Sequence, residues 1–226
     1  MIFDVCMTDS NKVAYIILPD GIQDDLKKWM NYAVGLYKCS IVCIWGVDWA
    51  NDLSPWIAEG ITRKDPPFRG HAAFFLKNFV KDHIKSLETE LKVTNPERTL
   101  VGVSLSGLFA VWSAHNTDAF RNIISISGSL WYDGFVNWKR SNVVNPAVSR
   151  IYLSLGDKEK KVKEPRFANV QDATEEVVKC LEKEAPEVKY VLERNVMHFS
   201  PLIPRLDKAF EFAFAPDRVG GDGDED

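Results

Sequence analysis

The sequence has no apolar run long enough to cross a membrane, since none reaches the roughly 18 residues that a spanning helix requires. Its first residues also lack the basic and apolar regions of a signal peptide. We therefore expect a cytoplasmic protein with no membrane partner.

The sequence also has no excess of basic residues. The 226 residues include 28 Lys and Arg against 32 Asp and Glu, which gives a formal net charge of -4. Because no Lys/Arg-rich face stands out, a nucleic-acid partner is not expected. The four cysteines, Cys6, Cys39, Cys43 and Cys180, do not have the spacing of metal ligands, so we expect no metal site. Cys39 and Cys43 lie in or near an apolar run and are expected to be buried free thiols.

Strand-like apolar runs alternate with helix-like segments through nearly the whole chain. Strands are expected at residues 2–7, 12–18, 40–45, 99–103, 122–127, 149–155 and 188–193. Helices are expected at residues 23–34, 71–91, 108–114, 134–139, 173–184 and 199–214. This alternation predicts an α/β fold with a mostly parallel central sheet and helices on both faces.

The domain organisation follows from the same pattern. We expect one domain over residues 1–216 and an acidic, Gly-rich, disordered tail at residues 217–226. Residues 46–70, with three Pro and two Trp, are expected to form a long loop, and loops of this length in compact domains are usually functional.

A motif for nucleophilic catalysis lies at residues 101–108, which read VGVSLSGL. An apolar strand, a sharp turn with Ser104 at its centre and a helix make up the nucleophile elbow of α/β-hydrolases. The turn demands small residues on both sides, and Gly102 and Ser106 satisfy this, although Ser106 replaces the second Gly of the usual pattern. A simple Gly/Ser turn before a buried helix is the alternative interpretation.

A serine nucleophile needs a base, and the base needs an acid that orients it. His198 follows the last expected strand, and both Asp157 and Glu159 follow the strand before it. The order Ser104, acid, His198 is that of α/β-hydrolases, and all three positions fall at the carboxyl ends of strands. By analogy with other hydrolases of this fold, in which the third residue after such a Gly reaches the His, Glu159 is the favoured acid, but Asp157 stays open.

The tetrahedral intermediate of such a reaction needs two backbone N–H donors. One is expected at Leu105, directly after the nucleophile, and the other at Gly21 or Ile22, after the strand at residues 12–18. Among the other histidines, His115 is expected to end the helix after Ser104, where a cation would complement the helix dipole.

These residues resemble the esterase family of α/β-hydrolases that includes enterochelin esterases, which hydrolyse a siderophore trilactone, and esterase D-like enzymes. The resemblance covers residues 15–212. It is carried by Leu18-Pro19-Asp20-Gly21, Asp52-Leu53-Ser54-Pro55-Trp56, Pro96-Glu97-Arg98-Thr99, Ser127-Gly128-Ser129-Leu130-Trp131 and Leu153-Ser154-Leu155-Gly156.

The resemblance implies a serine hydrolase acting on small carboxylic esters, without a cofactor and without a large cap. It implies that Ser104 is the nucleophile and His198 the base. Trp49, Trp56 and Trp131 are expected to line the substrate pocket. At least two of the tryptophans near the pocket are expected to be core residues instead. Asn51 stands where siderophore esterases often have Arg, which disfavours a large anionic iron chelate. The expected activity is therefore that of a serine carboxylesterase; a trilactone esterase and a non-catalytic binding protein are the alternatives.

Overall fold

The computed structural model describes residues 1–61 and 64–215, so the tail expected at residues 217–226 lies outside the described part of the chain. Within it, seven strands form the central sheet. They are β1 (Ile2–Cys6), β2 (Lys12–Ile17), β3 (Ser40–Trp45), β6 (Glu97–Val103), β7 (Asn122–Ile126), β8 (Arg150–Gly156) and β9 (Glu187–Glu193).

The sheet is mostly parallel, as the sequence predicts. Its strand order is β1-β3-β2-β6-β7-β8-β9, and only β1 runs antiparallel to its neighbour, β3. β7 and β8 are buried along their whole length, which explains their nearly continuous apolar runs. The carboxyl ends of β6, β7, β8 and β9 therefore meet along one edge of the sheet.

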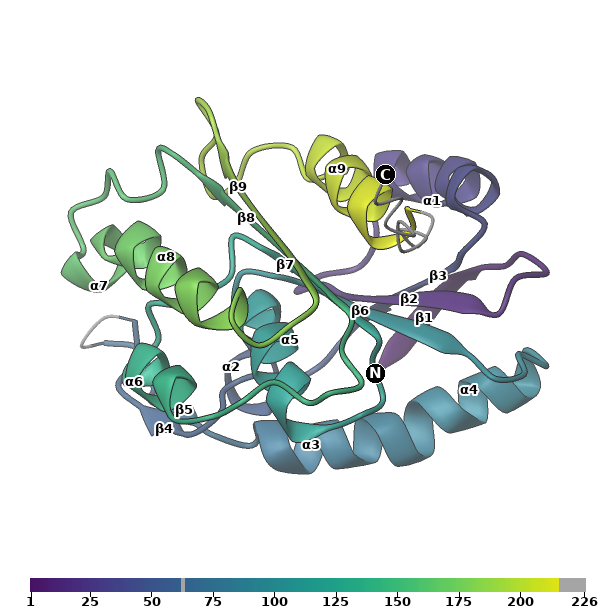
Figure 1. The fold of residues 1–226 in the computed structure, drawn as a ribbon, viewed down its shortest axis with the longest axis horizontal. Helices are drawn as coiled ribbons and strands as arrows, with labels where there is room; N and C mark the ends of the chain where they lie inside the picture. The colour runs from purple at the N-terminus through teal and green to yellow at the C-terminus, as the bar shows by residue number, and fades with distance from the viewer. Residues whose placement is uncertain (62–63, 216–226) are drawn as a thin grey trace, which may run out of the picture.

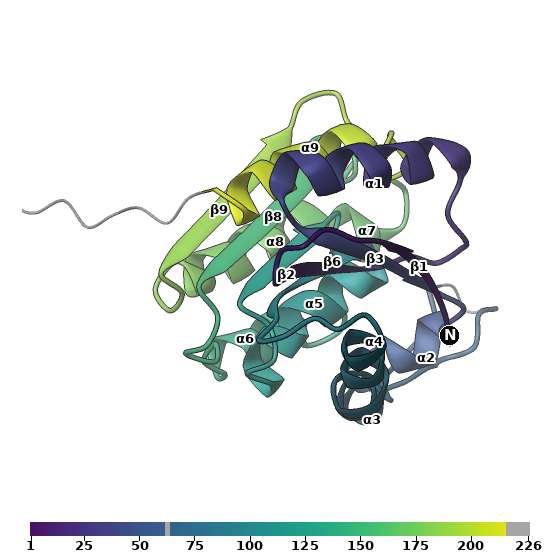
Figure 2. The same cartoon turned by 90° about the vertical axis from the view of Figure 1, so that its right-hand side faces the viewer.

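Helices cover both faces of the sheet, which confirms the predicted fold class (Figures 1 and 2). One face carries α1 (Asp24–Tyr37) and α9 (Ile203–Ala213), which are joined by a hydrogen bond of 2.7 Å from Trp29 Nε1 to Asp207 Oδ1. The other face carries α3 (Ala72–Asn78), α4 (Lys85–Glu90), α5 (Leu105–Asn116), α6 (Phe135–Arg140) and α8 (Val170–Leu181). Among the described helices, none is long and apolar enough to span a membrane.

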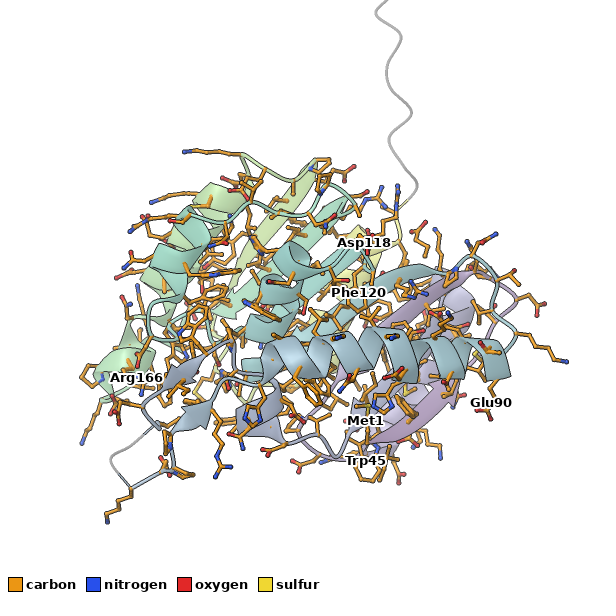
Figure 3. The ribbon with its side chains drawn as sticks, turned by 90° about the horizontal axis from the view of Figure 1, so that it is seen from below. Met1, Trp45, Glu90, Asp118, Phe120 and Arg166 are labelled. Atoms are coloured by element: carbon orange, nitrogen blue, oxygen red, sulfur yellow. The ribbon has the colours of Figure 1, made fainter. Side chains whose placement is uncertain are left out.

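The helix expected at residues 71–91 contains a π-helical segment that the sequence does not reveal. This segment, η1 (Phe79–Ile84), joins α3 to α4, and the three parts run on as one long helix across a face of the molecule (Figure 3). The helical spacing of Phe74, Phe75, Phe79, Ile84 and Leu87 predicts the buried side of this helix only in part. Phe75, Phe79 and Ile84 are buried, whereas Phe74 is 71% exposed.

Residues 46–70 are more ordered than the loop that the sequence predicts. They include α2 (Trp49–Asp52) and a two-stranded sheet of β4 (Ile57–Ala58) and β5 (Phe68–Arg69). Gly70 has a φ of +74°, and a Cβ atom there would lie 2.4 Å from the backbone of Trp56. The short pairing of β4 with β5 therefore depends on Gly70. Hydrophobic periodicity is read over windows longer than these two-residue strands, so it cannot detect them.

Candidate active site

Ser104 lies in a strained turn between β6 and α5. Its φ of 58° and ψ of -121° are unfavourable for a residue with a side chain. A Cβ atom at Gly102 would lie 1.9 Å from the carbonyl oxygen of Ser106, so only glycine fits there. The Ser106 hydroxyl accepts a hydrogen bond from Val103 N at 2.7 Å and lies 2.8 Å from the Ile17 oxygen, to which it donates. The serine in the usual glycine position thus ties the turn to β2.

The structure brings Ser104, His198 and Glu159 together. Ser104 Oγ lies 3.1 Å from His198 Nε2, and His198 Nδ1 lies 2.8 Å from Glu159 Oε2. The carboxylate partner assigns the proton to Nδ1, which leaves Nε2 free to accept from the serine hydroxyl. His198 is 32% exposed and the Glu159 side chain is 3% exposed, so the base can meet a substrate while the acid is enclosed.

Hydrogen bonds keep the buried Glu159 carboxylate ionised. Burial by itself would raise the pKa of Glu159, but the bonds from His198, Ser127 and the Gly156 N–H together outweigh it and lower the pKa below its ordinary value. Ser127 Oγ and Gly156 N both donate to Oε1, at 2.5 and 2.8 Å. Oε2 is thereby left for His198.

Asp157, the other candidate acid, does not contact His198. Its Oδ1 accepts a hydrogen bond of 2.8 Å from the backbone N–H of Asn195, and its own N–H donates to the Glu193 oxygen at 2.9 Å. These bonds join the loop after β8 to the loop after β9. Gly156 allows this close approach, because a Cβ atom there would lie 2.2 Å from the Val196 oxygen.

The expected N–H donors lie at the ends of the elements that the sequence indicates. Leu105 is the first residue of α5, where an α-helix leaves its N–H without an acceptor inside the helix. Gly21 and Ile22 follow β2, and the nearest neighbour of a Cβ atom at Gly21 would be the Trp45 ring at 3.5 Å. Because β2 and β6 are adjacent and parallel, both loops lie on the same edge of the sheet.

The three tryptophans expected at the pocket have different surroundings. Trp49 and Trp56 are partly buried and pack against the core without belonging to its buried cluster, so they are not the core residues that the sequence predicts. Trp56 Nε1 also donates to the Asp133 oxygen at 2.8 Å. Trp131 lies on the loop after β7, with the ring of Phe167 4.7 Å away.

Arg166 of α7 (Pro165–Ala168) joins that loop to residues 46–70. Its guanidinium lies 5.2 Å from the centre of the Trp131 ring and donates to the Gly60 oxygen at 2.6 Å. Figure 3 places Arg166 beside the two-stranded sheet. Nothing in the sequence marks this residue, since its partners, which include the Asp133 carboxylate at 3.1 Å, lie far away in the chain.

Two residues behave differently from the sequence interpretation. Ser127, with a φ of 48°, holds the acid although it was recognised only as part of a motif. His115 lies in the last turn of α5 but is not the cation expected there: burial, with a smaller contribution from Lys139, lowers its pKa to about 4. The motif position of Ser127 was a usable signal, whereas the burial of His115 depends on the tertiary fold.

Comparison with known proteins supports this reading of the fold. The family model described as "Putative esterase" matches residues 46–190, more than half of the chain. The uncharacterized protein YbbA of Bacillus subtilis is 25% identical over 154 residues, which are 66% of this chain and 62% of YbbA. The match therefore spans less than two thirds of the length of that relative.

Solved structures share the fold at low identity. An IroE-like serine hydrolase from Shewanella oneidensis superposes with a TM-score of 0.73 at 18% identity, covering 94% of this chain and 75% of the other. The siderophore hydrolase EstA from Aspergillus nidulans superposes with a TM-score of 0.68 at 20% identity, covering 91% and 84%. With its parallel sheet and the extent of the family match, the chain belongs to the "Putative esterase" family of α/β-hydrolases.

Proposed function

We propose that the protein is a serine carboxylesterase. The observation that carries the proposal is the continuous hydrogen-bonded chain from Ser104 Oγ through His198 to Glu159, with distances of 3.1 and 2.8 Å. A hydroxyl, an imidazole and a buried carboxylate in this order can form a nucleophile at neutral pH. The chain lies at the carboxyl edge of a parallel sheet, where open α/β folds bind their ligands.

In the proposed reaction, Ser104 Oγ attacks the ester carbonyl carbon while His198 Nε2 takes its proton. The oxyanion accepts hydrogen bonds from Leu105 N–H and from an N–H at Gly21 or Ile22. Collapse breaks the bond to the alkoxy group, which leaves with the proton of His198. Water then attacks the acyl-enzyme, His198 takes a proton from the water and returns it to Ser104, and the carboxylic acid departs.

The side chains around His198 favour a small ester with an apolar acyl or aryl group. Met197 is 61% exposed and Phe199 is 94% exposed, so the base is flanked by two open apolar side chains. The Phe199 ring lies 4.9 Å from the imidazole, with the two planes nearly perpendicular.

The experiment is a panel of p-nitrophenyl esters of increasing acyl length, assayed with the wild type and with Ser104→Ala. We expect wild-type turnover that Ser104→Ala lowers by at least about a thousandfold. Equal turnover by both proteins contradicts the proposed nucleophile, and no turnover of any ester by the wild type favours a hydrolase-fold binding protein.

Hydrolysis of a siderophore trilactone is a narrower candidate, because EstA is a siderophore hydrolase. Asn51 argues against it: its amide donates to Asp48 at 2.8 Å and its Oδ1 accepts from Arg69 N at 3.2 Å, so it stabilises its own loop. Comparing a trilactone with p-nitrophenyl butyrate decides between the two. A trilactone preference of several orders of magnitude would contradict the broader assignment.

A further inference from the structure

A chain of charged side chains lies behind Glu159, on the side away from His198. Arg205 Nη2 is 3.8 Å from Glu159 Oε1, and Arg205 Nε donates to Glu193 Oε2. Lys208 Nζ donates to the other oxygen of Glu193 at 3.0 Å. Charges of alternating sign thus lead from the candidate acid toward the surface, where Lys208 is 53% exposed.

The inner members of this chain are fully enclosed. The Arg205 side chain is 3% exposed and that of Glu193 is 1% exposed. Arg205 also donates from Nη2 to Ser154 Oγ at 3.3 Å, which connects α9 to β8. Glu193 ends β9 and Arg205 lies in the first turn of α9, so the two residues bracket the loop that carries His198.

Stability alone is a weak reason to bury these charges. Replacing a buried ion pair by apolar side chains of similar size is often neutral or stabilising, because removing two charges from water is costly. Here Arg205 of the pair lies 3.8 Å from the oxygen of Glu159 that His198 does not use. The burial of Arg205 at this point therefore suggests that its charge serves the candidate acid.

We infer that Arg205 is a positioning residue that acts through Glu159, and that Glu193 determines how large the electrostatic effect of Arg205 on His198 is. This inference rests on the proposed function. Arg205, with Ser127 and Gly156, holds Oε1 so that Oε2 stays directed at Nδ1. The Arg205 charge disfavours the imidazolium that forms during the reaction, and the Glu193 charge offsets it.

Other ionisable groups near these four charged side chains are not substituted in any of the variants used in the test. Tyr152 of β8 interacts with Glu193 and Arg205, and Tyr190 of β9 interacts with Glu159. Burial raises the pKa of both phenols well above neutrality, so neither carries a charge in the assay. The carboxylates Glu175 of α8 and Glu211 of α9 act on Tyr190 and Tyr152, respectively, and are also unchanged.

The test is the pH profile of kcat/KM for p-nitrophenyl butyrate, whose acid limb reports protonation of the base in the free enzyme. For Arg205→Met we expect the midpoint of this limb to rise by about 0.5 unit, because a cation is lost. For Glu193→Gln we expect a fall of about 0.5 unit, because an anion is lost while Arg205 remains. The double variant returns to the wild-type midpoint, and Arg205→Lys keeps it.

A merely structural role does not produce shifts of opposite sign. The matched control is Arg150→Met: this buried arginine, 3.3 Å from Glu187, begins β8 at the end of the strand away from the site. We expect Arg150→Met to lose stability without a change in the midpoint of the acid limb. Arg205→Met also lowers kcat by about tenfold with little change in KM, since it affects the orientation of the acid rather than substrate contacts.

Shifts of the same sign, or no shift in either single variant, overturn the inference. If Arg205→Met does not fold, the inference is tested with the other two variants. Glu193→Gln must lower the midpoint of the acid limb, and the double variant, which leaves no buried charge unpaired, must restore it. Any other result counts against Arg205. A wild type that hydrolyses no ester refutes the proposed function, whereas an active wild type with unmoved midpoints refutes only the role of Arg205.

Discussion

Substituting Glu159 by Gln tests the candidate acid with little change in shape. The Gly156 N–H donates to Oε1 at 2.8 Å, so an oxygen must stay at that position. The amide nitrogen of Gln is therefore forced to the position of Oε2, facing His198 Nδ1. Because an amide nitrogen donates, Nδ1 must accept and the imidazole proton moves to Nε2.

In that tautomer, Nε2 cannot accept the proton of Ser104. We expect kcat to fall by about 10³- to 10⁴-fold, or about 4 to 5.5 kcal/mol in the barrier, as for a triad held in the wrong tautomer. The matched control is Asp157→Asn. Asp157 Oδ1 only accepts from Asn195 N, and the amide oxygen of Asn can do the same. We expect that variant to lose less than about tenfold.

The assay is steady-state hydrolysis of p-nitrophenyl butyrate at pH 7.5, with thermal unfolding of each variant as a check on folding. Small and equal losses in both variants contradict the reasoning and indicate a Ser–His dyad. A larger loss in Asp157→Asn identifies Asp157 as the acid and refutes the choice of Glu159.

Further predictions concern the elbow and the buried histidine. Gly102→Ala should destabilise the fold by about 3 kcal/mol or more in urea denaturation, because its Cβ would lie 1.9 Å from the Ser106 oxygen; a wild-type midpoint contradicts this. Ser106→Ala should lose about 1 to 3 kcal/mol in the same measurement while keeping turnover, since it leaves the Val103 N–H without its Oγ acceptor; unchanged stability argues against this bond. His115 is kept neutral by the fold, with its pKa lowered to about 4, so the unfolded chain binds a proton first as the pH falls. The contribution of neutral His115 to the free energy of unfolding is fully present above the unfolded-state pKa of about 6.5, and it decreases by about 3 kcal/mol as the pH falls toward 4. The variant His115→Gln should not show this loss.

The sequence predicts the sheet well because its central strands are buried on both faces. β3 coincides with the expected residues 40–45, and β7 differs from the expected strand by one residue. Such strands are marked by apolar runs whatever their neighbours are. The helix after Ser104 begins three residues earlier than expected, because Leu105, Ser106 and Gly107 carry no apolar period.

The site is only partly visible in the sequence. Chain order indicates Ser104 and His198 together with an acid, but the choice of Glu159 depends on which carboxylate faces the imidazole. That in turn depends on how the loops after β8 and β9 pair, through Lys158 N to the Val196 oxygen at 3.1 Å. Arg205 gives no signal at all, since a helix pattern cannot distinguish a buried arginine from an exposed one.

The most direct measurement of the central claim is labelling with a fluorophosphonate, followed by mass spectrometry of the intact protein and its peptides. A fluorophosphonate reacts with an activated serine and leaves one phosphonyl adduct. The wild type should take up one adduct on the peptide that carries Ser104, and Ser104→Ala should take up none under the same conditions. A wild type without an adduct, or equal labelling of Ser104→Ala, would contradict the assignment of Ser104 as the nucleophile.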